Sequence, residues 1–190
     1  LLGFELEVSQ EPDRATKLRT ILTSQASQIT SGDTDEKQAV THYSYILIDC
    51  PPSLNLLTIN AMTAGDAVLV PLQCEFFALE GLSQLLSTVD EVKSALNPRL
   101  DIQGVVLTMY DARSNLSGQV MADVRAFMGD KVYQTVIPRN VRVSEAPSHG
   151  KPVLLYDYRC SGSQAYIKLA SEIIQRERDL TARSRQPVPA

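Results

Sequence analysis

The stretch YILIDCPPS, residues 45–53, sets the expected fold of this chain. Four apolar residues lead straight into Asp49, and the two prolines that follow prevent the chain from turning directly into a helix. A short apolar run bounded by turn residues is typical of a buried strand. Residues 45–48 are therefore predicted to form a strand that delivers the carboxylate of Asp49 to its carboxyl end.

Three similar runs follow along the chain, and helical patterns separate them. The runs are residues 67–70, 104–107 and 132–137. The clearest helical pattern places leucines and valines at three- and four-residue steps over residues 79–96, and this stripe is interpreted as core. Further helices are predicted at residues 12–29, 54–64, 116–128 and 163–179, with a surface loop at residues 30–38.

The alternation of strands and helices predicts an α/β fold. Strands that are apolar throughout and separated by helix-length connections favour a mainly parallel sheet with helices on both faces. In such sheets ligands bind beyond the carboxyl ends of the strands. Polar residues at those ends are therefore the first candidates for a functional site.

Composition excludes several classes of protein. With 190 residues, 44% hydrophobic residues and a mean hydropathy of −0.09, the chain is long and apolar enough to form one globular domain, which disfavours disorder. No apolar run approaches the length of a membrane-spanning helix. Three cysteines form neither a zinc-binding cluster nor a disulfide framework, which favours a reducing cytoplasm. Cys50 and Cys74 are predicted to be small buried residues, not nucleophiles.

The net charge of −4 is unevenly distributed. Residues 1–138 carry 9 basic and 17 acidic side chains, whereas residues 139–190 carry 9 basic and 5 acidic ones. The second segment is therefore a candidate basic surface. For Arg176, Arg178, Arg183 and Arg185 near its end, we favour the simpler interpretation of solvated side chains on a fraying helix.

Polar residues follow every predicted strand. Asp49 at the end of the first strand can hold Mg²⁺ through water, as in P-loop NTPases, or can simply cap the next turn. Gln73 and Glu75 follow the second strand. The last strand runs into Arg139, Asn140 and Arg142, which packing does not require, so a functional role stands beside that of an ordinary surface loop.

Four long strings of sequence carry a family resemblance. They are YILIDCPPSLNLLTINAM at residues 45–62, VPLQCEFFALEGLSQLL at 70–86, GVVLTMYDARSNL at 104–116 and VIPRNVRVSEAPSHGKPVLLYD at 136–157. In order and spacing they resemble the ParA/Soj chromosome- and plasmid-partitioning ATPases of the MinD-like, deviant Walker-A class, and most of all the chromosomal branch. The resemblance, from Leu2 to Asp179, implies a P-loop NTPase-like fold. It also implies that residues 1–180 are the C-terminal part of one ATPase domain, before a disordered tail at 181–190.

The resemblance assigns roles to individual residues. Asp49 matches the Walker B aspartate, which acts on Mg²⁺ through water. Pro138, Arg139 and Asn140 match the stretch that lies along the adenine of ATP. Arg113 and Arg142 match arginines that support sequence-nonspecific DNA binding by the ATP-bound dimer, consistent with the pairing of guanidinium groups with phosphate oxygens.

The function implied by the resemblance is chromosome or plasmid partitioning. It comprises ATP-dependent formation of a homodimer, nonspecific DNA binding, and ATP hydrolysis stimulated by a ParB-type centromere-binding protein. The implied location is cytoplasmic and nucleoid-associated, away from the membrane, and the implied cofactors are ATP and Mg²⁺.

The phosphate loop of the family does not occur in these residues. No GxxxxGK[ST] string is present, and so no lysine for the phosphates and no Ser/Thr for Mg²⁺ can be assigned. The chain starts at Leu1 without a methionine, so it is expected to be a C-terminal fragment that lacks the P-loop strand. Such a fragment is expected neither to hydrolyse ATP nor to bind it tightly.

Two alternatives remain open at this point. A MinD-like membrane-cycling ATPase should end in an amphipathic helix, but residues 176–190 offer only Leu180 and Val188 as large apolar side chains. A non-catalytic scaffold or DNA-contact module is the other alternative, and an upstream reading frame with a phosphate loop would eliminate it.

Overall fold

The computed structural model describes residues 13–30, 43–51 and 53–184. The chain divides into two compact units, the first comprising Leu1–Val68 and Gln84–Asp101, the second Leu69–Ser83 and Ile102–Ala190. Of the loop predicted at residues 30–38, all but Thr30, which ends a helix, lies outside the described residues, as do Pro52 and the chain end at 185–190.

In the first unit, helix α2 (Lys17–Thr30) packs with helix α3 (Leu56–Ala64) through a buried asparagine. The side-chain amide of Asn60 donates to the carbonyls of Arg14 at 2.6 Å and Leu56 at 2.9 Å, and its oxygen accepts the N–H of Leu18. Asn55 caps α3 by accepting two backbone N–H groups. Buried polar groups are stabilising only when they are satisfied in this way.

Two strands run side by side, β1 (Ala67–Gln73) and β2 (Asp101–Thr108). The N–H of Asp101 donates to the carbonyl of Asp66 where both strands begin, and the N–H of Cys74 donates to the carbonyl of Thr108 where both end. Start pairs with start and end with end, so the strands are parallel. Both contain the predicted apolar runs, and these two predictions are confirmed.

The predicted strand at residues 132–137 is interrupted. Parallel bridges pair Val132 with Val105 and Pro138 with Tyr110, so the segment does lie beside β2. Between the bridges, however, the N–H groups of Gln134 and Thr135 donate to the carboxylate of Glu172, at 2.8 and 2.9 Å. Because these amides are committed to a side chain, the ladder cannot be continuous.

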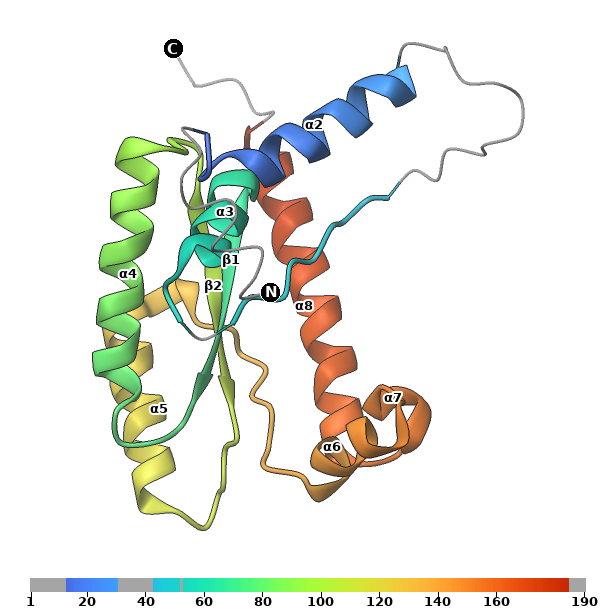
Figure 1. Cartoon of the computed structure of the whole chain (residues 1–190). Helices are drawn as coiled ribbons and strands as arrows, with labels where there is room; N and C mark the ends of the chain where they lie inside the picture. Colours follow the sequence, from blue (N-terminus) through green and yellow to red (C-terminus); the bar gives the residue numbers. More distant parts are fainter. Residues whose placement is uncertain (1–12, 31–42, 52, 185–190) are drawn as a thin grey trace. The chain divides into compact units, whose positions relative to one another are not determined.

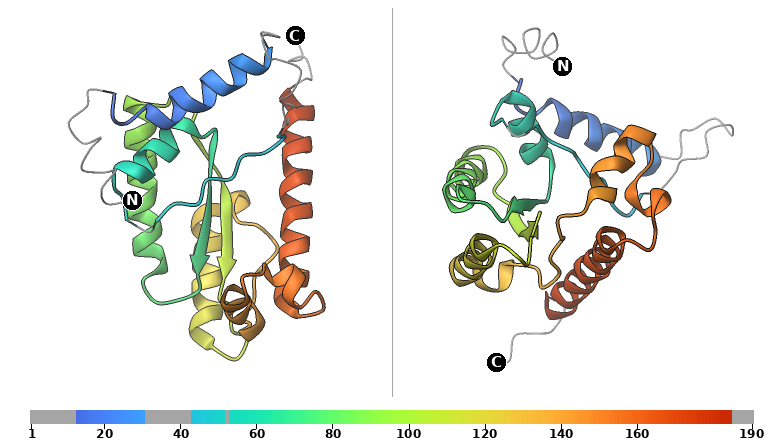
Figure 2. Two further views of the ribbon diagram at one scale, coloured as in Figure 1. Left: turned by 45° about the vertical axis from the view of Figure 1, so that its right-hand side comes forward. Right: turned by 90° about the horizontal axis from the view of Figure 1, so that it is seen from below.

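Helices cover the sheet of the second unit on both faces, as predicted. Figure 2 shows helix α5 (Asn115–Met128) and helix α8 (Ser161–Ser184) on opposite sides of β2. On the α8 side, Ala165 and Leu169 pack in one cluster with Val106, Tyr133 and Ile137. The α5 side buries Val120 and Val124, and Ser117 Oγ donates to the carbonyl of Cys74.

The remaining predicted helices are also present. Helix α4 (Ala78–Ala95) buries Leu82, Val89 and Val92 along the predicted stripe. Helix α8 continues to Ser184, so the first four residues of the predicted disordered tail are helical. The short helices α6 (Val141–Glu145) and α7 (Val153–Tyr156) were not predicted (Figure 1). Within the described chain, no helix is both long and apolar enough to span a membrane.

Three expectations from the sequence are wrong. Residues 45–48 belong to no strand of the described chain, and all four side chains are exposed, Leu47 to 90%. Cys50 after them is likewise exposed, whereas Cys74 is buried as predicted. An apolar run is buried only where a neighbouring strand and covering helices complete its surroundings. Arg176 is the third case, because it is anchored and not merely solvated.

Arg176 bridges α8 to the segment that runs beside β2. Its guanidinium donates to the carbonyls of Asp130 at 3.0 Å and Val132 at 2.8 Å, and it pairs with Glu172 at 3.1 Å. These contacts occur because the helix places Arg176 one turn after Glu172, on the same face. Arg176 therefore ties the second half of α8 to the segment around residues 130–132 of the same unit.

Candidate functional site

An open cavity of about 720 Å³ lies in the second unit, at the carboxyl ends of β1 and β2. The end of β1, the loop after it and the start of α4 supply residues 72–78 and Gly81. The loop after β2 and the start of α5 supply Met109, Asp111, Ser114, Leu116 and Ser117. Arg139 closes the set of lining residues from the segment that follows Pro138. The cavity thus occupies the edge at which parallel α/β proteins bind their ligands.

Arg139, on the segment after Pro138, contacts both the loop after β1 and the loop after β2. Its backbone N–H donates to the carbonyl of Tyr110 at 2.9 Å, which fixes the start of the loop. Its guanidinium pairs with Glu75 at 3.2 Å, and both side chains are 56% exposed. The pair spans two strand ends, and because it is half in solvent it can exchange partners at little cost.

Met109 lies in the cavity wall with a positive φ of 53°. Residues other than glycine rarely adopt this left-handed conformation, which costs about 1–3 kcal/mol and persists only where neighbouring contacts enforce it. Here the next residue provides them, because Tyr110 donates its N–H to Ile137 and accepts the N–H of Arg139. The exit of β2 is therefore held in a defined, strained shape.

Asp111 and Arg113 form a forked ion pair at the rim. One carboxylate oxygen of Asp111 accepts the backbone N–H and Nε of Arg113, both at 3.0 Å, and the other accepts Nη2 at 2.9 Å. The hydrogen bond from the guanidinium lowers the pKa of Asp111 to about 2. The Arg113 side chain is nevertheless 89% exposed, so its outer edge faces solvent.

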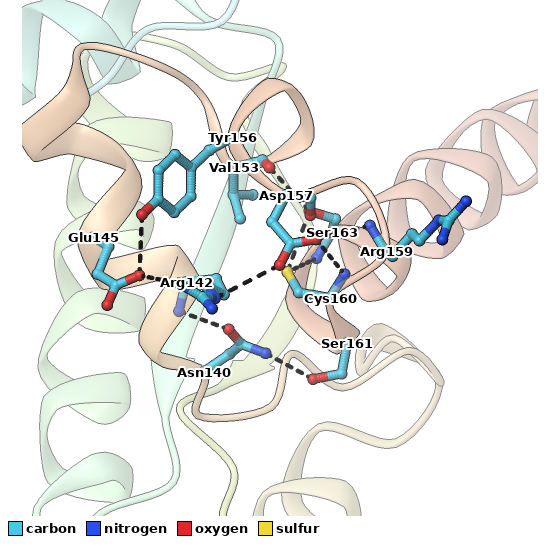
Figure 3. A network of polar contacts seen from close by, with 10 residues as sticks. All are labelled: Asn140, Arg142, Glu145, Val153, Tyr156, Asp157, Arg159, Cys160, Ser161 and Ser163. Atoms are coloured by element: carbon cyan, nitrogen blue, oxygen red, sulfur yellow. Dashed lines mark hydrogen bonds and ion pairs between the residues drawn. The ribbon is translucent and has the colours of Figure 1, made fainter.

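Asn140 is committed to holding the chain together. Its oxygen accepts the N–H of Arg142 at 2.8 Å and so caps α6, and its amide nitrogen donates to Ser161 Oγ at 2.8 Å (Figure 3). Asparagine is favoured at this position because its short side chain reaches the free N–H groups of the first turn. Asn140 therefore connects the start of α6 to the start of α8.

Arg142 lies between two carboxylates. Its Nη1 contacts Glu145 at 2.9 Å, and its Nε lies 3.6 Å from Asp157 (Figure 3). The hydroxyl of Tyr156 donates to the same oxygen of Glu145 at 3.2 Å. The pairing with Glu145 is the main reason that the pKa of Arg142 is raised. This polar network links α6 to α7.

A glycine allows α6 and α8 to approach closely. A Cβ atom on Gly162 would lie 2.4 Å from Val143 Cγ2, so a larger residue does not fit. Beneath it, Ser163 is fully buried, and its hydroxyl lies 2.6 Å from the carbonyl oxygen of Asp157 and 3.1 Å from that of Val153. The polar network around Arg142 is therefore adjacent to a closely packed contact between α6 and the start of α8.

The predicted site residues have different surroundings. Arg139 lines the cavity, Pro138 forms the adjoining bridge to Tyr110, and Asn140 faces α8. Asp49 belongs to the first unit, in the exposed segment after residue 48. Among the residues that the structure describes, no cluster of three His, Cys, Asp or Glu could hold a metal ion.

Sequence reasoning missed the aromatic part of the cavity wall. Phe76 and Phe77 line the cavity, and their rings meet edge to face at 5.1 Å. Both side chains are exposed. Two adjacent phenylalanines between polar residues, after a strand end, could have signalled this surface, because neither is needed for a core.

Comparison with known families and solved structures agrees with this fold. A family described as AAA domain (AAA_31) matches residues 14–102. The cobyrinic acid a,c-diamide synthase of Mycobacterium smegmatis, solved with bound ADP and magnesium, is 30% identical, with a TM-score of 0.69 over 93% of this chain and 59% of that one. The cell division ATPase MinD of Pyrococcus furiosus is 26% identical, with a TM-score of 0.62 over 85% and 58%. The fold is that of the P-loop NTPase-like α/β proteins.

Curated relatives narrow the class to a family. The chromosome partitioning protein ParA of Caulobacter vibrioides is 62% identical over 184 residues, covering 97% of this chain and 64% of the relative. The sporulation initiation inhibitor protein Soj of Bacillus subtilis is 63% identical over 173 residues, covering 91% and 63%. The chain belongs to the ParA/Soj family. It spans a little under two-thirds of the length of these relatives.

Proposed function

We propose that this chain is part of a partitioning ATPase that binds ATP and Mg²⁺, forms a homodimer and binds DNA without sequence preference. A ParB-type centromere-binding protein stimulates its ATP hydrolysis, and the protein works in the cytoplasm on the nucleoid. The observation that carries this proposal is the 62–63% identity to ParA and Soj proteins over nearly the whole chain. The identity to MinD is much lower, at 26%, which disfavours a membrane-cycling role.

The second unit supplies the adenine side of the nucleotide site. Pro138 and Arg139 border the cavity at the strand ends, and the strained backbone at Met109 gives its wall a fixed shape. An open, partly apolar cavity with a few polar groups suits a planar base. Asn140 contributes by holding the loop, because both ends of its side-chain amide are already hydrogen-bonded.

Binding of the ATP phosphates and Mg²⁺ requires residues other than Pro138, Arg139 and Asn140. Asp49 is assigned to Mg²⁺ through water, and hard cations favour such oxygen ligands. No GxxxxGK[ST] string occurs in the 190 residues, so no loop in them can surround the phosphates. The 190 residues alone are therefore expected neither to hydrolyse ATP nor to bind it tightly.

DNA binding is assigned to Arg113 and Arg142. Both guanidinium groups reach solvent in the second unit. Each makes a weak, salt-sensitive phosphate contact, and a dimer doubles the number of contacts without reading bases. This accounts for DNA binding by a chain whose net charge is −4.

The experiment compares the full-length protein with its Arg113→Ala and Arg142→Ala variants in DNA co-sedimentation with ATP. Arg99→Ala, which removes an exposed arginine of the first unit, is the matched control. The proposal expects weaker, less salt-dependent binding for the first two variants and wild-type binding for the control. Unchanged binding in all three would contradict the DNA assignment.

The ATPase part is tested separately on the same full-length protein. Arg139→Ala is expected to raise the KM for ATP with little loss of stability, because its ion pair is half exposed. Asp49→Asn is expected to abolish turnover. Wild-type turnover by Asp49→Asn, or by residues 1–190 alone, would contradict the assignment.

A further inference from the structure

Both arginines assigned to DNA are paired with carboxylates of the same chain. Asp111 holds Arg113 through two oxygens, and Glu145 and Asp157 together hold Arg142. Neither guanidinium can offer the N–H groups used in these pairs to a phosphate without first giving up at least part of these contacts. An arginine paired with carboxylates of the same chain thus occurs at two places in the second unit.

The occupied edge of Arg113 is one of the edges by which a guanidinium can bind a phosphate. Nε and Nη2 form the flat fork of a guanidinium that matches two oxygens of a carboxylate or a phosphate equally well. In Arg113 both of these atoms are on Asp111, at 3.0 and 2.9 Å. In Arg142 the Nε edge faces Asp157, and Nη1 is on Glu145.

The carboxylates are held in place by further hydrogen bonds. Asp111 also accepts the backbone N–H of Arg113, and Glu145 also accepts the hydroxyl of Tyr156. Asp157 accepts the N–H groups of Arg159 and Cys160, at 3.1 and 3.2 Å. If an arginine turned toward DNA, its carboxylate would stay nearby and repel the phosphate within the screening length.

We propose that Asp111 and Glu145 are built-in competitors of DNA, which weaken the phosphate contacts of Arg113 and Arg142 and keep binding readily reversible. This inference rests on the proposed DNA-binding function. It gives the carboxylates a role of their own at that site. Asp157 acts in the same way on Arg142, at a longer distance.

The test uses Asp111→Asn and Glu145→Gln in the full-length protein with ATP and a random-sequence DNA duplex. Each substitution removes the charge and keeps one acceptor oxygen. In Asp111→Asn this oxygen can still accept the backbone N–H and Nε of Arg113, but the bond from Nη2 is lost. In Glu145→Gln it can accept both Arg142 and Tyr156. Binding is measured by fluorescence anisotropy at low and high salt. Each variant is expected to bind about two- to fivefold more tightly at low salt, as expected for a surface ion pair, with the gain shrinking at high salt.

The control is Asp123→Asn on α5, which changes the net charge equally but removes a carboxylate bonded to Gln119. It is expected to bind DNA like the wild type. In an Arg113→Ala background, the gain from Asp111→Asn should shrink, since the partner that it releases is gone. Thermal unfolding confirms that each variant is folded.

The outcomes separate the two proposals. If Arg113→Ala and Arg142→Ala leave DNA binding unchanged, the DNA-binding function and this inference both fail. If these arginines matter but Asp111→Asn and Glu145→Gln bind more weakly or equally, only the inference fails. An equal gain from Asp123→Asn, or an undiminished gain in the Arg113→Ala background, would also overturn it.

Discussion

The guanidinium of Arg176 stacks on the ring of Tyr133, 4.1 Å from its centroid. The same guanidinium donates to the carbonyls of Asp130 and Val132. One turn earlier in α8, Glu172 accepts the N–H groups of Gln134 and Thr135. Two side chains of a helix therefore satisfy backbone groups that would otherwise need a strand partner.

Arg176→Ala is expected to lower the free energy of unfolding by about 1.5–3 kcal/mol, because it leaves two carbonyls without a charged donor and removes the stacking. Urea unfolding measures this as a lower midpoint with an unchanged slope. Arg178→Ala, two residues further along α8 and exposed, is the control and should change little. Equal midpoints for wild type and Arg176→Ala would refute the anchoring role.

Glu172 is expected to make stability depend on pH. Burial disfavours its charged form, but the N–H groups of Gln134 and Thr135 outweigh burial and lower its pKa. A carboxyl with a lowered folded pKa contributes stability above its unfolded pKa and loses it as pH falls through the folded value. The gap in melting temperature between wild type and Glu172→Gln should therefore be widest at neutral pH and should narrow as the pH falls below the ordinary glutamic acid pKa of about 4.3. A constant gap would contradict this.

Gly162→Ala is expected to destabilise the second unit by about 1–3 kcal/mol, since the new methyl group overlaps Val143 and forces α6 away from α8. Gly118→Ala, in α5 with open space around its Cβ position, should instead stabilise by about 0.5–1 kcal/mol. Chemical denaturation of both variants measures the difference. Similar effects from the two substitutions would show that the close approach is not limiting.

Asn140→Ala is expected to cost about 1 kcal/mol through loss of the α6 cap. Asn140→Asp keeps an oxygen for the N–H of Arg142 and should retain most of this stability. Any effect on ATP affinity shared by both variants then reports on the nucleotide site and not on the cap. Denaturation of the full-length protein measures the loss of the cap, and nucleotide titration measures the effect on the nucleotide site.

Much of the fold followed from local pattern. The runs in β1 and β2 and the stripe of α4 are long, regular and supported by their neighbours, so period and length sufficed to predict them. Helices α6 and α7, with five and four residues, are too short to show a period. The break within residues 132–137 depends on Glu172, 38 residues after Gln134, and no local pattern reveals such a contact.

The candidate site was predictable in its location but not in its pairings. Polar residues at the strand ends located the cavity edge, and Arg139 is one of its walls. The pairing of Asp111 with Arg113 is between near neighbours, and their spacing alone allows it. The contact of Arg142 with Asp157 exists only because α6 and α7 fold back on each other. Ion pairs of that kind appear only with the tertiary structure.

Residues 45–48 affect how the protein behaves in solution. Four consecutive exposed apolar side chains form a continuous apolar surface, which folded proteins normally cover or interrupt with charged residues. The 190-residue chain should therefore associate as its concentration rises, which sedimentation velocity detects. Leu47→Lys should suppress the association and improve solubility, whereas the same change at exposed Leu155 in α7 should not.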